Sequence, residues 1–158
     1  MENLITLKVR AAEGMCRVCG TIREVYYLND SSYGERLLLT SDGKYYAYVN
    51  LFKDEVYDEV ELIIKDIFCV KGKKLSLKES ADYLNLTFGV ACDDINYQVI
   101  DASKNIKSCL NCGSKDLDFE ISNNEYVKQV EVPLITHFKW KELEKEEKKK
   151  LIAKKLNL

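Results

Sequence analysis

The chain has 158 residues, of which 46% are apolar and 32% are charged, with one proline and seven glycines. This composition argues against a disordered chain and against a small disulfide-stapled secreted scaffold, and it provides for one sizeable core. A net charge of −2 argues against a strong overall attraction to nucleic acid or to a membrane surface. We therefore expect a single domain over residues 1–158.

The start of the chain, MENLITLKVR, lacks a basic leader followed by an apolar run, and no apolar stretch approaches about 18 residues. We therefore expect neither a secretory signal nor a membrane span. Six cysteines without such a leader indicate a reducing compartment, in which thiols bind metal or stay free. The expected location is cytoplasmic, and so compact a chain is typical of prokaryotic or phage proteins.

Four strands are predicted in the first third of the chain. Alternation of apolar and polar residues predicts an opening strand around Ile5–Val9 and a second strand over Ile22–Leu28. Two more strands are predicted over Arg36–Thr40 and Tyr45–Phe52. The residues between them, Ser41–Lys44, include Asp-Gly, which predicts a tight hairpin turn.

The apolar period then changes to that of a helix. Apolar residues recur at helical spacing over Val56–Ile67, and acidic residues in the first two turns complement the helix dipole. The basic, glycine-containing segment Lys71–Lys74 is predicted to end this helix. Ser76 and Glu79 then form a capping-box pattern, which predicts a second helix with an apolar stripe that reaches Phe88.

The last third of the chain predicts two strands and a helix. The strands fall around Leu117–Ile121 and Val127–Ile135, and Pro133 confines the second of them to a sheet edge or to a place where its missing N–H is not needed. The segment His137–Leu158 is predicted to be helical, with a break near Leu143. Its lysines are predicted to form a solvated face. These lysines are Lys148, Lys149, Lys150, Lys154 and Lys155.

The pattern Cys-x-x-Cys-Gly occurs twice, at Cys16–Gly20 and at Cys109–Gly113. This spacing lets two thiolates reach one tetrahedral ion from a tight turn, and the glycine adopts a backbone conformation that other residues resist. Two such motifs, each next to strand-like residues, predict one site with four cysteine ligands. We expect Zn²⁺ to be bound by Cys16, Cys19, Cys109 and Cys112.

Both motifs resemble the knuckles of the zinc-ribbon (rubredoxin-knuckle) class, over residues 15–20 and 108–114. In typical zinc ribbons the two knuckles lie about 10 to 20 residues apart, whereas roughly ninety residues intervene here. The predicted elements indicate an α+β fold with an antiparallel sheet, in which the zinc-ribbon-like site is split by an inserted hairpin and two helices (36–100). A C-terminal strand and helix (126–158) follow. The resemblance to zinc ribbons implies no particular activity.

Three interpretations of the four cysteines remain open. A structural zinc site is favoured because thiolates fill all four positions and leave none for water or substrate. Iron in the same geometry is the second. Dithiol redox chemistry is the third, and it needs a helix that starts directly after the first cysteine of a motif. Strand-forming residues follow both motifs, which disfavours redox chemistry.

The remaining candidate residues are predicted to be structural. Cys69 and Cys92 stand at the apolar ends of predicted helices and are expected to be small buried hydrophobes. His137 is the only histidine, and no nucleophile motif accompanies it, so a structural or capping role is expected rather than that of a general base. We therefore expect a protein that is not an enzyme.

One segment has a DNA-binding interpretation. Leu77–Thr87 looks like the first helix of a helix-turn-helix, with Phe88–Asn96 in the place of the recognition helix. That second segment carries two aspartates and no lysine or arginine, so the phosphates of DNA would repel it. A capped core helix is the favoured interpretation.

The predicted strands are rich in tyrosine, which suits protein recognition because a tyrosine buries a large area at low entropic cost. The alternative is that these rings cover packed helices. The leading hypothesis is a non-enzymatic, zinc-stabilised intracellular binding protein with an unidentified protein partner. A nucleic-acid-binding zinc-ribbon protein that uses Lys148–Lys155 and the knuckle loops is the first alternative, and a thiol oxidoreductase is the second. The tyrosines concerned are Tyr26, Tyr27, Tyr45, Tyr46 and Tyr48.

Overall fold

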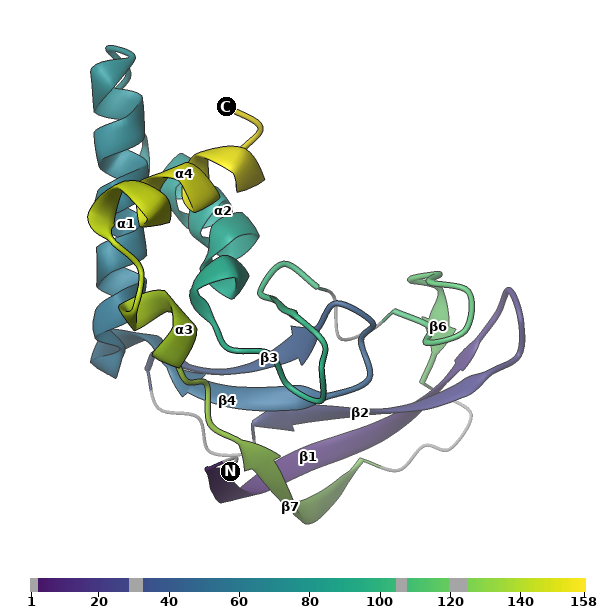
Figure 1. Ribbon diagram of the computed structural model, residues 1–158. Coiled ribbons are helices and arrows are strands. Elements are labelled where there is room, and N and C mark those ends of the chain that lie inside the picture. Colours follow the sequence, from purple (N-terminus) through teal and green to yellow (C-terminus); the bar gives the residue numbers. More distant parts are fainter. Residues whose placement is uncertain (1–2, 29–32, 105–107, 120–124) are drawn as a thin grey trace.

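A computed structural model describes residues 3–28, 33–104, 108–119 and 125–158. The chain has an α+β fold in three layers: helices stand over one antiparallel sheet, and a second antiparallel sheet lies beneath it (Figure 1). We call the lower one sheet A and the middle one sheet B. The α+β class and the position of the cysteine motifs on either side of a long insertion are confirmed.

Sheet A is built around one long strand. Val9 of this strand, β1, pairs with Leu28 on one side and with Lys128 on the other, so β2 and β7 lie on opposite edges. β6 continues the edge of β7, because Met15 pairs with both β2 and β6. Pro133 lies on an edge strand, as predicted. The strands of sheet A are β1 (Leu4–Cys16), β2 (Ile22–Leu28), β6 (Leu117–Asp118) and β7 (Tyr126–Pro133).

Sheet B is made of the inserted hairpin and one short strand. The predicted turn is present, and Gly43 has a φ of 75° there, which favours glycine. The hairpin forms a sheet of its own above sheet A, and one isolated bridge, Tyr48 with Leu134, links β4 to the residue that follows β7. The rings of Tyr26 and Tyr46 meet between the two sheets at 5.1 Å. The strands, in the order β4-β3-β5, are β3 (Glu35–Thr40), β4 (Tyr46–Asn50) and β5 (Ile100–Asp101).

The helices begin and end close to where the sequence predicted. Asp54 caps the first helix, Gly72 follows its end with a φ of 74°, and Ser76 and Glu79 form the predicted capping box. The last helical segment breaks into two helices around Leu143, also as predicted. The helices are α1 (Glu55–Val70), α2 (Leu77–Thr87), α3 (Phe138–Lys141) and α4 (Lys145–Lys155), with short 3₁₀ turns η1 (Leu51–Lys53) and η2 (Phe88–Ala91).

The residues after α2 do not form a second helix. They form η2 and then a tight turn in which Ile95 pairs with Gln98. Gly89 in η2 packs so closely on β5 that a Cβ there would collide with the carbonyl oxygen of Ile100. The helix-turn-helix interpretation is therefore wrong, and α2 is the capped core helix that was favoured.

Two apolar clusters hold the upper layers together. One lies among the helices and includes Ile64, Trp140 and Ile152, and the other joins sheet B to η2 through Leu38 and Phe88. The β1–β2 hairpin extends away from both clusters toward one end of the molecule, on the right in Figure 1. The cysteine motifs therefore lie far from the helical layer.

Candidate metal centre

The first knuckle is the turn of the β1–β2 hairpin. The backbone N–H of Cys16 donates to the carbonyl oxygen of Thr21 at 2.9 Å, and the N–H of Gly20 donates back to the carbonyl oxygen of Cys16 at 2.8 Å. Gly20 has a φ of 78°, which explains the glycine at this position. These bonds hold Cys16 and Cys19 on one side of the turn.

The second knuckle repeats the same pattern. The N–H of Cys109 donates to Ser114 at 2.7 Å, the N–H of Gly113 donates to Cys109 at 3.0 Å, and Gly113 has a φ of 77°. The N–H of Asn111 lies 3.4 Å from the sulfur of Cys109 and points at it. The two motifs therefore have the same conformation, although they lie in different surroundings.

Pairing of β1 with β6 brings the two knuckles side by side. Cys16 lies opposite Leu117 in this ladder, and the N–H of Arg17 donates to the carbonyl oxygen of Asp116 at 3.0 Å. The side chain of Arg17 forms ion pairs with Asp116 at 2.9 Å and with Asp118 at 3.7 Å. Main-chain and side-chain contacts thus join segments 99 positions apart.

Arg23 also fixes the second knuckle, and the sequence analysis missed it. Its side chain is only 3% exposed, and it donates to the carbonyl oxygen of Ser108 and, at 2.9 Å, to that of Gly43. It therefore ties β2 to the second knuckle and to the turn of sheet B. A single arginine in a strand pattern carries no signal of such partners, because both acceptors are distant backbone carbonyls.

The four cysteine sulfurs predicted as ligands lie within 4.8 Å of one another. The sulfur of Cys16 is 3.5 Å from that of Cys112, and the sulfur of Cys19 is 3.5 Å from that of Cys109. A tetrahedral ion with metal–sulfur bonds of about 2.3 Å holds its sulfurs about 3.8 Å apart. The cluster therefore fits one four-coordinate metal ion. The first cysteine of each knuckle is buried and the second is exposed.

The thiols of the cluster differ in acidity. The hydroxyl of Thr21 lies 3.2 Å from the sulfur of Cys19, and its hydrogen bond lowers the pKa of Cys19 to about 5. At Cys112 the N–H of Ser114 acts in the same direction, but the neighbouring sulfurs, led by that of Cys16, outweigh it and raise the pKa to about 12. Crowded sulfurs resist joint ionisation, and a bound cation removes that resistance.

A comparison with known protein families, one with curated proteins and one with solved structures each found no match. The likeness to zinc ribbons accordingly concerns the two knuckles alone. Of the helices in the described residues, none combines the length and the apolar character needed to cross a membrane.

The two remaining cysteines differ from each other. Cys92 is buried, as predicted, and its burial raises the pKa of its thiol well above the usual range. Cys69 is exposed on α1, so the prediction of a buried side chain was wrong there. The cause is that Ile67 and Phe68 form the buried face of the last turns of α1, and Cys69 lies outside that face.

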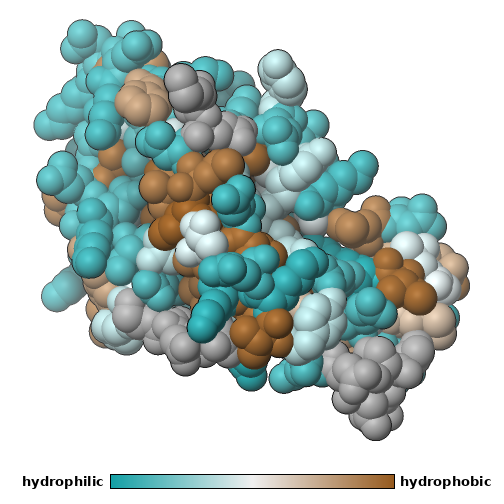
Figure 2. Space-filling view, turned by 90° about the horizontal axis from the view of Figure 1, so that it is seen from below, coloured by the Kyte–Doolittle hydropathy of each residue, from teal (hydrophilic) through white to brown (hydrophobic). Residues whose placement is uncertain are grey.

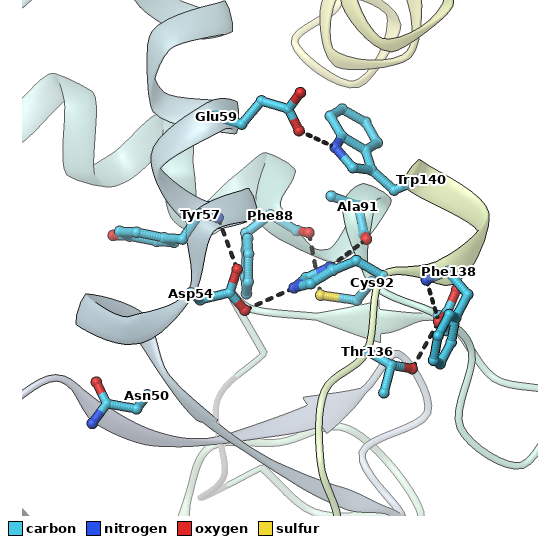
Figure 3. A network of polar contacts seen from close by, with 12 residues as sticks. Asn50, Asp54, Tyr57, Glu59, Phe88, Ala91, Cys92, Thr136, Phe138 and Trp140 are labelled. Carbon is cyan, nitrogen blue, oxygen red and sulfur yellow. Dashed lines mark hydrogen bonds and ion pairs between the residues drawn. The ribbon is translucent and has the colours of Figure 1, made fainter. Parts of the chain in front are cut away.

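His137 contacts Asp54 and Ala91, two residues of the polar network in Figure 3. Its Nε2 is 2.7 Å from a carboxylate oxygen of Asp54, and its Nδ1 is 2.6 Å from the carbonyl oxygen of Ala91. The ring also meets Phe88 edge to face at 5.6 Å. Both ring nitrogens are engaged, so His137 joins α1 to the residues before α3 in a structural role.

Proposed function

We propose that this chain is a non-enzymatic binding protein, held by a structural Zn²⁺, that acts through a protein–protein surface. The observation that carries the proposal is the closed cluster of four cysteine sulfurs. Four thiolates complete a tetrahedral zinc site and leave no position for water or substrate, which is the arrangement of structural zinc sites. Zinc bound there would supply a fixed link between the knuckles.

The knuckle end of the molecule is the surface that best suits a protein partner. Val18 and Leu110 lie within the knuckles and are 69% and 40% exposed, and the adjacent Ile22 is 60% exposed. Figure 2 shows apolar side chains at this end, on the right, in addition to those nearer the middle of the same face. Apolar groups on rigid turns form interface cores at little entropic cost. We call these three residues the knuckle patch.

The tyrosines of the sheets give less support to a recognition surface. Tyr45 is 41% exposed, but the others are half-buried. The hydroxyl of Tyr46 accepts from the backbone of Tyr26 at 3.2 Å, and that of Tyr48 donates to Glu35 at 2.7 Å. These rings mainly fill the space at the edges of the two sheets.

The nucleic-acid alternative has less support. Arg17, the basic residue within the first knuckle, is neutralised by two aspartates. The lysine-rich α4 lies in the helical layer, at the other end of the molecule (Figure 1), and Lys148 and Lys149 are paired with acidic residues of α1. This alternative predicts a continuous basic stripe from α4 to Arg17 and Lys107, and Lys107 lies outside the described residues.

The redox alternative also has less support. In dithiol oxidoreductases a helix that begins at the motif lowers the pKa of the reactive thiol, whereas the low pKa of Cys19 comes from hydrogen bonds, led by that of Thr21. The first knuckle leads into β2 and the second into β6, so neither starts a helix.

Metal analysis tests the zinc site. We expect about one zinc per chain in protein purified without chelator, and its loss in Cys19→Ser. The matched control is Cys69→Ser, because Cys69 is also exposed but lies on α1. Iron in place of zinc would change the identity of the metal but keep the site. A folded protein without metal would contradict the proposal of a metal site.

Partner capture tests the surface. We expect wild-type protein to retain a protein partner from lysate and Val18→Ser with Leu110→Ser to lose it. Val127→Ser is the control, since Val127 is 61% exposed on β7. Steeply salt-dependent binding of oligonucleotides, without a captured protein, would support the nucleic-acid alternative instead.

A further inference from the structure

A groove of about 740 Å³ lies between the C-terminal half of α1 and the first turn of α2, at the opposite end of the molecule from the knuckles. Its volume falls within the range of about 300–1,000 Å³ that is typical of small-molecule sites. None of the residues used so far for the metal centre or the knuckle patch lines it.

Part of the lining of the groove is apolar. Cys69 from α1, Leu75 from the connecting loop and Leu77 from α2 all contribute. Leu77 is 94% exposed, although it stands at the start of a helix that is otherwise packed on the core. An apolar ligand in the groove would cover this leucine and gain the free energy of its burial.

One cation of the groove has no carboxylate partner. Lys65 pairs with Glu61 at 2.7 Å, and Lys73 pairs with Glu79 at 2.8 Å. Lys74 also lines the groove and makes no ion pair with any residue in the described parts of the chain. Lys74 is therefore available to an anionic group.

A buried hydroxyl in the wall of the groove also lacks a partner. Ser80 is only 7% exposed, and its Oγ makes no hydrogen bond with the described residues. A serine or threonine inside a helix commonly donates to the carbonyl four residues earlier. Thr87 of the same helix does so, to Tyr83 at 2.7 Å, but Ser80 does not. The hydroxyl group of Ser80 is therefore available to donate to an acceptor outside the helix.

We propose that this groove binds an amphiphilic organic anion, a molecule with an apolar chain or ring and one carboxylate-type head group. The apolar part lies against Leu75 and Leu77, and the head group accepts hydrogen bonds from Lys74 and Ser80. This site is independent of the zinc site and of the knuckle patch.

Dodecanoate, below its micelle concentration, is the probe for calorimetry on the full-length protein. We expect saturable binding with one molecule per chain. Dodecanol keeps the chain and lacks the charge, so we expect its affinity to be about threefold to fivefold lower. Acetate keeps the charge and lacks the chain, so it should not bind measurably.

Variants locate the site. Leu77→Ser should weaken dodecanoate at least about tenfold, and Lys74→Gln about threefold to fivefold. Their controls are Leu62→Ser, an exposed leucine of α1, and Lys71→Gln, a nearby lysine, neither of which lines the groove. Ser80→Ala should weaken binding about threefold without lowering the melting temperature, because it removes an unpartnered buried hydroxyl.

Alkylation of Cys69 gives a local readout, because this exposed thiol lines the groove. We expect dodecanoate to slow its modification by iodoacetamide, followed by mass spectrometry, and dodecanol to do so less. No dodecanoate binding, equal effects of the groove and control variants, or unchanged alkylation of Cys69 would each overturn the proposal. A protein partner lost in Leu77→Ser but not displaced by dodecanoate would overturn it as well.

Discussion

Two half-buried carboxylates connect the helices of this protein. Asp54 caps α1 and contacts the Nε2 of His137, 83 positions away in the sequence. Asp93 accepts from the backbone N–H groups of Phe138 at 2.8 Å and Lys139 at 3.1 Å, so it caps α3 from outside the helix. Each carboxylate therefore satisfies backbone donors that a helix start leaves open.

Removal of the Asp93 cap should destabilise the protein. For Asp93→Ala we expect the free energy of unfolding in urea to fall by about 1–2 kcal/mol, because two backbone donors lose their acceptor. The control is Asp94→Ala. Asp94 is the exposed neighbour, and its replacement should change the free energy by less than about 0.5 kcal/mol. Equal effects of the two variants would contradict the capping role.

The same carboxylate predicts a dependence on pH. Burial raises the pKa of Asp93, but hydrogen bonds from Thr136, Lys139 and Phe138 outweigh it and leave the pKa below its ordinary value of 3.8. A lowered pKa in the folded state stabilises the protein above the unfolded pKa, and this stabilisation is lost as pH falls through the folded value.

The stability of Asp93→Asn relative to wild type tests this dependence. We expect the deficit in free energy of unfolding to be full near pH 6 and to shrink as the pH falls toward about 3. Comparing the two proteins at each pH cancels the contribution of the cysteines, which is common to both. A deficit that stays constant with pH would contradict the shift at Asp93.

Among the elements, one carboxylate of α1 contacts both α3 and α4. Glu59 of α1 accepts from the indole Nε1 of Trp140 at 2.6 Å and from the ammonium of Lys148 at 2.9 Å. Trp140 is 2% exposed and is the only tryptophan in the chain, so its fluorescence reports directly on this docking.

Replacement of Glu59 should loosen this docking. For Glu59→Ala we expect a loss of about 1–3 kcal/mol in the free energy of unfolding, because a buried indole N–H loses its acceptor. The fluorescence maximum of Trp140 should shift to longer wavelength as water approaches the ring. Asp58→Asn, an exposed acidic position on the same helix, should leave the maximum unchanged. An unshifted spectrum in Glu59→Ala would show that apolar packing alone holds the ring.

The sequence predicted those elements whose signals are local. The capping box at Ser76 and Glu79, the turn at Gly43 and the two knuckle glycines all depend on neighbouring residues, and all were found where expected. The short strand β5 was missed, because its two residues form a strand only by pairing with β3. The roles of Arg23 and Asp93 were missed for the same reason, since their partners lie far away in the sequence.

At the scale of the whole molecule, the knuckle end and the helical layer depend on different contacts. The apolar clusters lie among the helices and on sheet B, whereas the knuckles are joined by β6 and by Arg17 and Arg23. Metal removal should therefore affect the two regions unequally.

Hydrogen exchange before and after treatment with a chelator tests this separation. In the stripped protein we expect faster exchange of the backbone amides of Arg17, Cys109 and Gly113, which bond within or between the knuckles. Amides in the middle of α1 should keep their protection, because that helix packs in the other cluster. Equal loss of protection in α1 would show that the site is required for the whole fold.

The length of β1 has a consequence for the denatured chain. Because this strand carries Cys16 to a point beside Cys112, 96 positions later, an ion shared by both knuckles closes a very long loop. In the chain-entropy picture, cross-linking a loop of this size removes disorder from the denatured ensemble worth about 4–5 kcal/mol. The cation would thus act as a reversible cross-link. Much of the stabilisation that it provides would arise from restricting the denatured chain, rather than from any contact in the native state.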